Sequence, residues 1–143
     1  MSTINELPRI HKWLRTILAS DSTLSSAVGG RFFEGNVPEG KSLPACVFSF
    51  TPDEDHRLTG PDRLWARGRA LVKIVGETNS DGTLQTAADR IDAVLHAARG
   101  GTSDVAIDYC VRRRPFRMKD TSVANKVYLH LGGEYDLAAR YTG

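Results

Sequence analysis

The strongest periodic pattern of the chain lies between Asp81 and Gly101, where apolar residues recur at helical spacing. The apolar positions of this segment are Leu84, Ala87, Ala88, Ile91, Val94, Leu95 and Ala98. Polar residues fill the opposite side, so the spacing predicts an amphipathic helix that covers an apolar surface. Asp81 or Thr83 is suited to cap its first turn, and Gly100-Gly101 to end it.

Two more helices are predicted before this one. Asn5 to Ala19 places its larger apolar residues on one face, and Pro8 fits an early helical position because no intrahelical N–H bond is needed there. Asp21 to Val28 reads as a shorter helix that Gly29-Gly30 closes.

Alternation of apolar and polar residues predicts the strands. The predicted strands are Arg31–Glu34, Ala45–Thr51, Leu64–Glu77, Val105–Val111 with the arginines that follow, and Val127–Ala139. Leu64–Glu77 is apolar on both faces, which predicts cover on both sides by helices or by a neighbouring subunit. Pro52 to Asp62 is too polar to pack and long for a hairpin, so we expect a projecting loop there.

Gly132-Gly133 leaves two interpretations of the last segment. A two-residue hairpin at these glycines would turn Glu134 and Asp136 toward the core. One unbroken alternation from Val127 to Ala139 avoids this, so we prefer a single long strand with a glycine bend and a turn around Lys119 to Asn125. The element order is helix, short helix, three strands, helix, two strands. Residues 1–143 are therefore expected to form a single α+β domain.

Charge and composition narrow the function classes. The formal net charge is +2, without the strong basic excess of a dedicated nucleic-acid binder. No apolar run approaches the length of a membrane span, and the first residues lack a signal-peptide pattern. Cys46 and Cys110 lie far apart in predicted strands, which favours buried thiols in a reducing compartment.

Catalytic or metal-binding patterns are not found in the sequence. His11 and His96 lie on polar helix sides where solvated histidines are expected, and His130 alternates outward. His56 follows Asp53, Glu54 and Asp55, for which a solvated charged loop is a better interpretation than a divalent-ion site. With no nucleophile elbow, zinc spacing or phosphate loop, we expect no enzyme and no metal or cofactor.

The sharpest charge cluster is Arg112-Arg113-Arg114, followed by Arg117 and Lys119. Consecutive residues of a strand alternate between its faces, so these arginines form a diffuse patch. A solvated strand end or a salt-bridge partner across a subunit interface is the preferred interpretation, and Asp53 to Asp55 of a neighbouring copy would be complementary. Nucleic-acid contact stays an alternative.

Several short blocks in order carry a family resemblance. They are Trp13-Leu14-Arg15, Leu24, Val28-Gly29-Gly30-Arg31-Phe32, Glu34-Gly35, Val37-Pro38, Leu43-Pro44, Val47-Phe48-Ser49-Phe50, Ala87-Ala88 to Leu95 with Ile91-Asp92 and Leu95-His96, and Tyr128-Leu129-His130. Together they resemble the tail terminator proteins, also called tail completion or tail-to-head joining proteins, of long-tailed bacteriophages and gene transfer agents. The resemblance covers nearly the whole chain, and Asp53–Arg63 and Arg112–Asn125 match least.

The resemblance implies a non-enzymatic virion protein, assembled in the host cytoplasm, with helices on a mostly antiparallel sheet. Six copies would form a ring at the head–tail junction that caps the tail tube protein, stops its polymerisation and meets a head-side neck, stopper or adaptor protein. DNA would at most pass through the lumen, and no membrane or small-molecule substrate is implied.

Contacts to a neighbouring subunit or ring are expected from two patches. These comprise Asp53, Glu54, Asp55, His56, Arg57 and Arg63 in the first, and Arg112, Arg113 and Arg114 in the second. The rival hypothesis is a monomeric α+β binding module that contacts nucleic acid through Arg112–Arg114.

Overall fold

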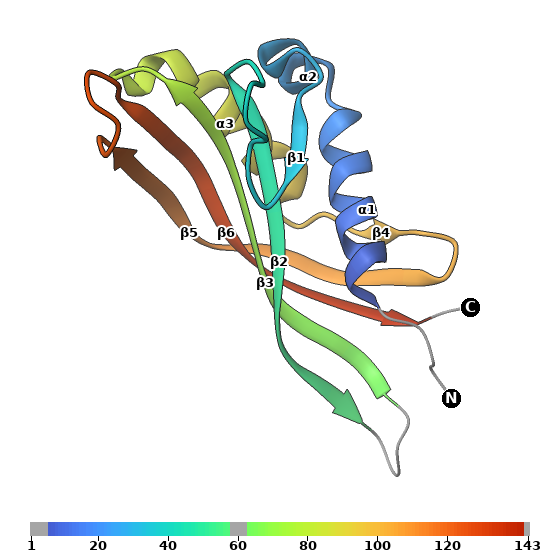
Figure 1. Cartoon of the computed structure of the whole chain (residues 1–143). Coiled ribbons are helices and arrows are strands. Elements are labelled where there is room, and N and C mark those ends of the chain that lie inside the picture. Colours follow the sequence, from blue (N-terminus) through green and yellow to red (C-terminus); the bar gives the residue numbers. More distant parts are fainter. Residues whose placement is uncertain (1–5, 58–62, 142–143) are drawn as a thin grey trace.

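The chain folds into one twisted sheet with helices along one of its faces (Figure 1). The computed structural model describes residues 6–57 and 63–141, and their side chains over 7–53 and 66–140. The elements in that part are α1 (Glu6–Ala19), α2 (Ser22–Val28), β1 (Phe32–Glu34), β2 (Ala45–Arg57), β3 (Arg63–Glu77), α3 (Asp81–Leu95), β4 (Gly100–Gly101), β5 (Val105–Asp120) and β6 (Tyr128–Tyr141).

The strand order across the sheet is β1-β2-β3-β6-β5-β4. Only β1 and β2 run parallel among the described pairs, and the long strands β2, β3, β6 and β5 are antiparallel neighbours. The α+β class predicted from the sequence is confirmed, and so is the mostly antiparallel sheet implied by the family resemblance. The sequence pattern missed β4, because two glycines carry no alternation.

The inner face of the sheet and the three helices enclose the hydrophobic core. Its fully buried large side chains come from both layers and include Ile10, Leu14, Leu18, Leu24, Phe48, Ile74, Leu84, Ile91, Leu95, Leu129, Tyr135 and Leu137. The predicted apolar face of α3 is confirmed, since Leu84, Ala87, Ile91 and Leu95 are its buried residues.

Helix α3 ends earlier than expected, and its N-cap differs. Ser80 is the N-cap residue and makes no side-chain cap bond, so the expected cap by Asp81 or Thr83 is wrong. The helix stops at Leu95 instead of at the glycine pair, because Ala97 turns to a φ of 63° and its N–H donates to the Cys110 carbonyl at 2.7 Å. Bonding to the edge of β5 takes the place of another helical turn.

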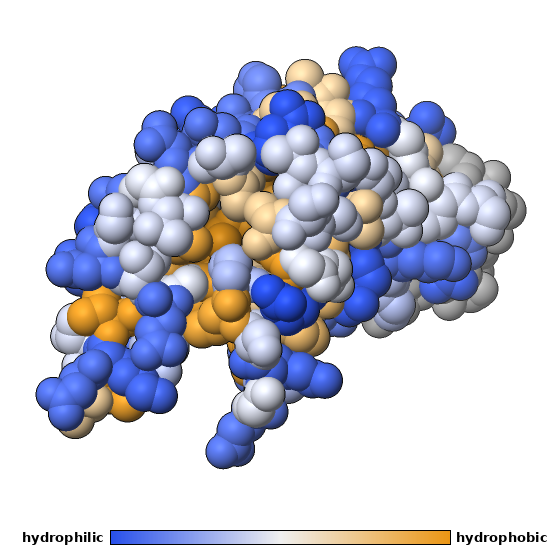
Figure 2. Space-filling view, turned by 90° about the horizontal axis from the view of Figure 1, so that it is seen from above, coloured by the Kyte–Doolittle hydropathy of each residue, from blue (hydrophilic) through white to orange (hydrophobic). Residues whose placement is uncertain are grey.

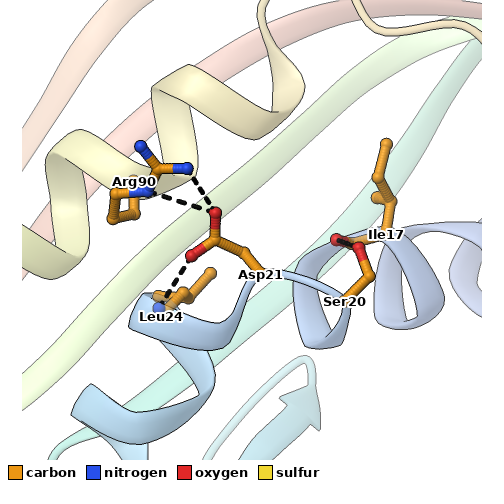
Figure 3. A network of polar contacts seen from close by, with 5 residues as sticks. All are labelled: Ile17, Ser20, Asp21, Leu24 and Arg90. Carbon is orange, nitrogen blue, oxygen red and sulfur yellow. Dashed lines mark hydrogen bonds and ion pairs between the residues drawn. The ribbon is translucent and has the colours of Figure 1, made fainter.

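Asp21 links helix α2 to helix α3 (Figure 3). It is the N-cap of α2, where its carboxylate accepts the Leu24 N–H at 2.9 Å. The second carboxylate oxygen accepts from Arg90 Nε of α3 at 3.1 Å. One side chain therefore satisfies a free helix N–H and fixes α2 against α3. Gly29 ends α2 at a φ of 60°, as the sequence predicted.

The last strand is one continuous strand, as the alternation predicted. β6 passes through Gly132 and Gly133 and pairs with β3 and β5 along its length. A Cβ at Gly132 would lie 2.0 Å from the Val72 carbonyl oxygen of β3. Glycine is therefore required here by close backbone approach, and the turn falls after Asp120, within the expected stretch.

The expected loop from Pro52 to Asp62 is wrong in its first half. β2 continues to Arg57 and pairs with β3 from Arg63 onward, with register shifts after Pro52 and after His56. Residues 58–62 lie outside the described part. This end of the hairpin reaches away from the helices (Figure 1). Because no core lies beside it, its strands need only the hydrogen bonds between their backbones and no apolar face.

Candidate interaction surface

The outer face of the sheet, turned away from the helices, combines charge and partly exposed apolar side chains. Cross-strand rows place Leu71 beside Glu134, and Lys73 beside Gly132 and Phe116. Met118 of the same strand is 43% exposed. This face is therefore the accessible side of an antiparallel sheet whose other side carries the core, and it offers both charged and apolar groups for contacts.

The three consecutive arginines face carboxylates of their own chain. Arg112 Nε lies 3.7 Å from Asp92 of α3, on the helix side of the sheet. Arg113 Nη1 lies 3.9 Å from Asp136, and Arg114 bonds Glu134, both on β6. The arginines thus divide between the two faces, as predicted. Their intrachain partners were not predicted, because sequence spacing does not reveal which strands are neighbours.

Arg114 and Glu134 also influence each other's protonation. Hydrogen bonding to the Arg114 guanidinium holds the pKa of the Glu134 carboxyl below its ordinary value. The same contact raises the pKa of Arg114. The Glu134 side chain is 17% exposed, whereas that of Arg114 is 63% exposed, so solvent screens the guanidinium and the pair contributes little to stability.

The first predicted patch is described only in part. Asp53 is exposed on β2. Glu54, Asp55, His56 and Arg57 continue that strand and Arg63 begins β3, but their side chains lie outside the described residues. The structure therefore brings Asp53 and the arginine patch to different strands, with β3 and β6 between them.

A groove opens where the outer face is partly roofed by the segment between β1 and β2. Figure 2 shows it from above, as a notch with apolar surface between that segment and the end of the β5–β6 hairpin. Its volume is about 310 Å³, and its lining residues are Gly35, Asn36, Val37, Lys41, Leu43, Val47, Lys73, Val75, Asp120, Tyr128 and His130. The groove accounts for much of the apolar outer side of β3: helices cover one face of this strand, and segment 35–43 partly covers the other.

Two polar side chains of the groove, Lys73 and His130, are partly desolvated. Burial lowers the pKa of Lys73. Burial, and secondarily the Lys73 charge, lowers the pKa of His130, while Asp120 acts in the opposite direction. Nδ1 of His130 is buried without a hydrogen-bond partner among the described residues. The expectation that His130 points outward is confirmed, but the residue lies in a groove.

His11 and His96 bond strand edges. His11 Nε2 accepts the Phe50 N–H at 3.1 Å where β1 has ended, and its Nδ1 faces Glu34 at 3.3 Å. His96 Nδ1 accepts the Arg112 N–H at 3.1 Å. The expectation of solvated histidines is wrong for His11, whose side chain is 16% exposed. Each imidazole satisfies a backbone donor that the adjacent short strand leaves unpaired.

The cysteines are free thiols in the core. Burial raises the pKa of both Cys46 and Cys110 to about 12. Such thiols carry no thiolate at neutral pH and are inert as nucleophiles. Within the described residues there is no cluster of three or more His, Cys, Asp or Glu side chains that could hold a metal ion. The described helices include none with the length and apolarity needed to span a bilayer.

Comparison with known proteins finds similarity in structure only. The sequence matches neither a known family nor a curated protein. A chain from the virion of a native gene transfer agent particle is similar over 87% of this chain and 91% of its own length, with a TM-score of 0.67 and 13% identity. A second solved chain, whose name states no activity, is similar over 99% of this chain and 98% of its own, with a TM-score of 0.57 and 12% identity. At these identities the comparison establishes a shared fold.

Proposed function

We propose that this protein is a virion structural protein that forms a ring on the end of a tail tube. The ring would stop polymerisation of the tube protein and join the tail to the head-side neck. The observation that carries the proposal is the fold shared with a chain of a gene transfer agent virion over 87% of this chain. The ordered sequence blocks that resemble tail terminators support it independently, because they are a property of the amino-acid sequence and not of the fold.

The outer face and the free end of β5 suit a subunit that must contact its own copies. Among the described residues, β4 pairs only with Ala106 and Ile107, so β5 beyond Arg112 has β6 as its one partner strand. A heterologous contact of this kind generates a closed ring when its rotation returns on itself. We propose a homohexamer located in the virion, at the head–tail junction.

The two predicted patches would supply charged contacts in that ring. Arg112 and Arg113 are 3.7 and 3.9 Å from their carboxylates, and their side chains are 42% and 44% exposed. Contacts of this length in solvent are weak, so these arginines can exchange an intrachain carboxylate for one of a neighbour at small cost. We propose the acidic stretch that begins at Asp53, with His56, Arg57 and Arg63, as the complementary patch.

Assembly with the tube protein of the same virion tests the proposal. Purified tube subunits are allowed to polymerise with and without this protein, and the products are imaged by electron microscopy. We expect a six-fold ring at one tube end and an arrest of elongation. Continued elongation in its presence, or tails of normal length in a virion that lacks the protein, would contradict the proposal.

The rival function, nucleic-acid binding by a monomer, is tested with the same preparation. It predicts DNA affinity that falls steeply with salt because phosphate contacts release counterions. The intrachain carboxylates beside all three arginines reduce the charge available for phosphates. We expect no such binding, and replacement of Arg113 by Glu should weaken ring assembly instead.

A further inference from the structure

The groove over the outer sheet face contains an amino group that has no anionic partner among the described residues. Lys73 is half-buried, and its ammonium lies 5.5 Å from the centroid of the Phe116 ring, across the gap left by Gly132. Within the described part of the chain no carboxylate lies within ion-pair distance of it. A partly desolvated cation gains free energy from an anion more readily than an exposed one does, because screening by water is weaker.

The charge balance of the groove favours an anionic ligand. Lys41 and Lys73 line it against one carboxylate, that of Asp120. Asp120 is engaged with its own turn, where it accepts the Ser122 N–H at 2.9 Å. His130 adds a buried nitrogen that finds no hydrogen-bond partner in the described part of the chain, which marks an incompletely satisfied site.

The walls and size of the groove restrict the ligand further. Val47 and Val75 form an almost fully buried floor, and Val37, Leu43 and Tyr128 form half-buried walls. A volume of about 310 Å³ is at the small end of ligand pockets, which span roughly 300–1,000 Å³. The space suits one aliphatic side chain of a peptide together with the residue next to it. The apolar walls do not suit the phosphate backbone of a nucleic acid.

We propose that this groove binds an acidic peptide segment of another protein. An aliphatic side chain of the segment would lie on Val47 and Val75, and an adjacent carboxylate would pair with the Lys73 ammonium. This site goes beyond the proposed ring function. It requires one copy of the chain, so its test is separate from the assembly test.

The test uses the isolated protein and two capped dipeptide probes. Acetyl-Leu-Asp-amide carries both recognised groups, and acetyl-Leu-Asn-amide has the same shape without the charge. Binding is followed by NMR of the His130 ring, assigned by the loss of its resonance in His130→Gln. We expect the aspartate probe to bind with a Kd on the order of 1 mM, as suits so small a ligand. Its carboxylate should raise the pKa of His130, since an anion favours the imidazolium.

Three variants distinguish this site from non-specific binding. Lys73→Met keeps the aliphatic stem and should weaken the aspartate probe about tenfold. Lys119→Met removes a charge from the same hairpin on the other face and should change nothing. Asp120→Asn keeps an acceptor for the turn and should tighten binding a few-fold, because it removes a negative charge in the groove lining that repels the probe carboxylate. Misfolding cannot imitate such a gain.

Three results would overturn the proposal. They are equal binding of the two probes, an unchanged affinity in Lys73→Met, and no tightening in Asp120→Asn. A shift of the His130 resonance with protein concentration in the absence of peptide would also overturn it, because a second copy would then occupy the groove.

Discussion

The two faces of the sheet are built from the same strands but serve different ends. On the inner face, Ile74 and Leu137 are fully buried against helices. On the outer face, the neighbours of these residues along the same strands are Lys73 and Asp136, which remain partly exposed. Because side chains alternate, one backbone supplies a dry core and a charged, half-apolar surface at once. Stability is therefore concentrated on one face, which leaves the other available for contacts.

The largest effect on stability is expected when a side chain of the inner face is shortened. Leu137→Ala should lower the free energy of unfolding by about 3 kcal/mol, because the side chain is fully buried and leaves a cavity. Leu71→Ala on the outer face should cost roughly 1 kcal/mol or less, since Leu71 is already half-exposed. Urea denaturation monitored by tryptophan fluorescence measures both, and equal losses would refute the division between the faces.

Gly132 is an exception on the outer face, because close approach of the β3 backbone, and not side-chain packing, restricts which residue fits there. Gly132→Ala should destabilise by roughly 2 kcal/mol, since the added Cβ would meet the Val72 carbonyl oxygen and force β3 to move. Gly82→Ala is the matched control: it adds the same atom in the first turn of α3, where it meets only Ser80 Oγ at 3.6 Å. That variant should be neutral or more stable by up to about 1 kcal/mol. Thermal denaturation of the two variants decides the point.

Substitution of Asp21 tests whether the stability of the helical layer depends on pH. Asp21→Ala should cost about 1 kcal/mol through loss of the α2 cap, whereas Asp21→Asn keeps an acceptor and loses only the charge. Arg90, and next the Leu24 N–H, hold the pKa of Asp21 below its ordinary value. This stabilisation is therefore present above the unfolded-state pKa and is lost as the pH falls through the folded-state pKa. Denaturation midpoints across acidic pH should fall less in Asp21→Asn than in the wild type, because Glu134 and other carboxylates with lowered pKa values still contribute to the loss in both proteins.

The smallest effect on stability is expected from the outer charge pairs. Arg114→Gln and Glu134→Gln, alone and together, should change the denaturation midpoint little, because the Arg114 side chain lies in solvent, where an ion pair is weak, and glutamine keeps a hydrogen-bonding group at either position. If the same variants impaired ring assembly, the outer face would be confirmed as a contact surface. A large loss of stability in either single variant would instead assign the pair to the fold.

Helices and strands were predictable where a long apolar period existed. The buried face of α3 and the unbroken alternation of β6 follow directly from spacing, because each apolar side chain must reach the one available core. Errors fell where the partner was distant in sequence. Helix α3 ends at Leu95 because the edge of β5 offers Ala97 a carbonyl, and no local pattern predicts that.

The candidate surface divides in the same way. The sequence identified Arg112–Arg114 as a charge cluster and predicted that it would split between faces. It did not identify Asp92, Asp136 and Glu134 as the partners. The groove was missed entirely, since Val37, Val75 and His130 belong to three segments whose adjacency depends on the strand order. His11 was misjudged because a polar helix position gives no indication of an uncovered strand edge beside it.

The sequence by itself determined the class of fold, the buried faces and the continuity of the last strand, because local spacing decides which side of an element is apolar. Only the tertiary structure decided which charges are paired, where helix α3 stops and that a basic, apolar-lined groove lies on the outer face. Those features depend on strand order and register, which bring together residues that spacing along the chain cannot relate.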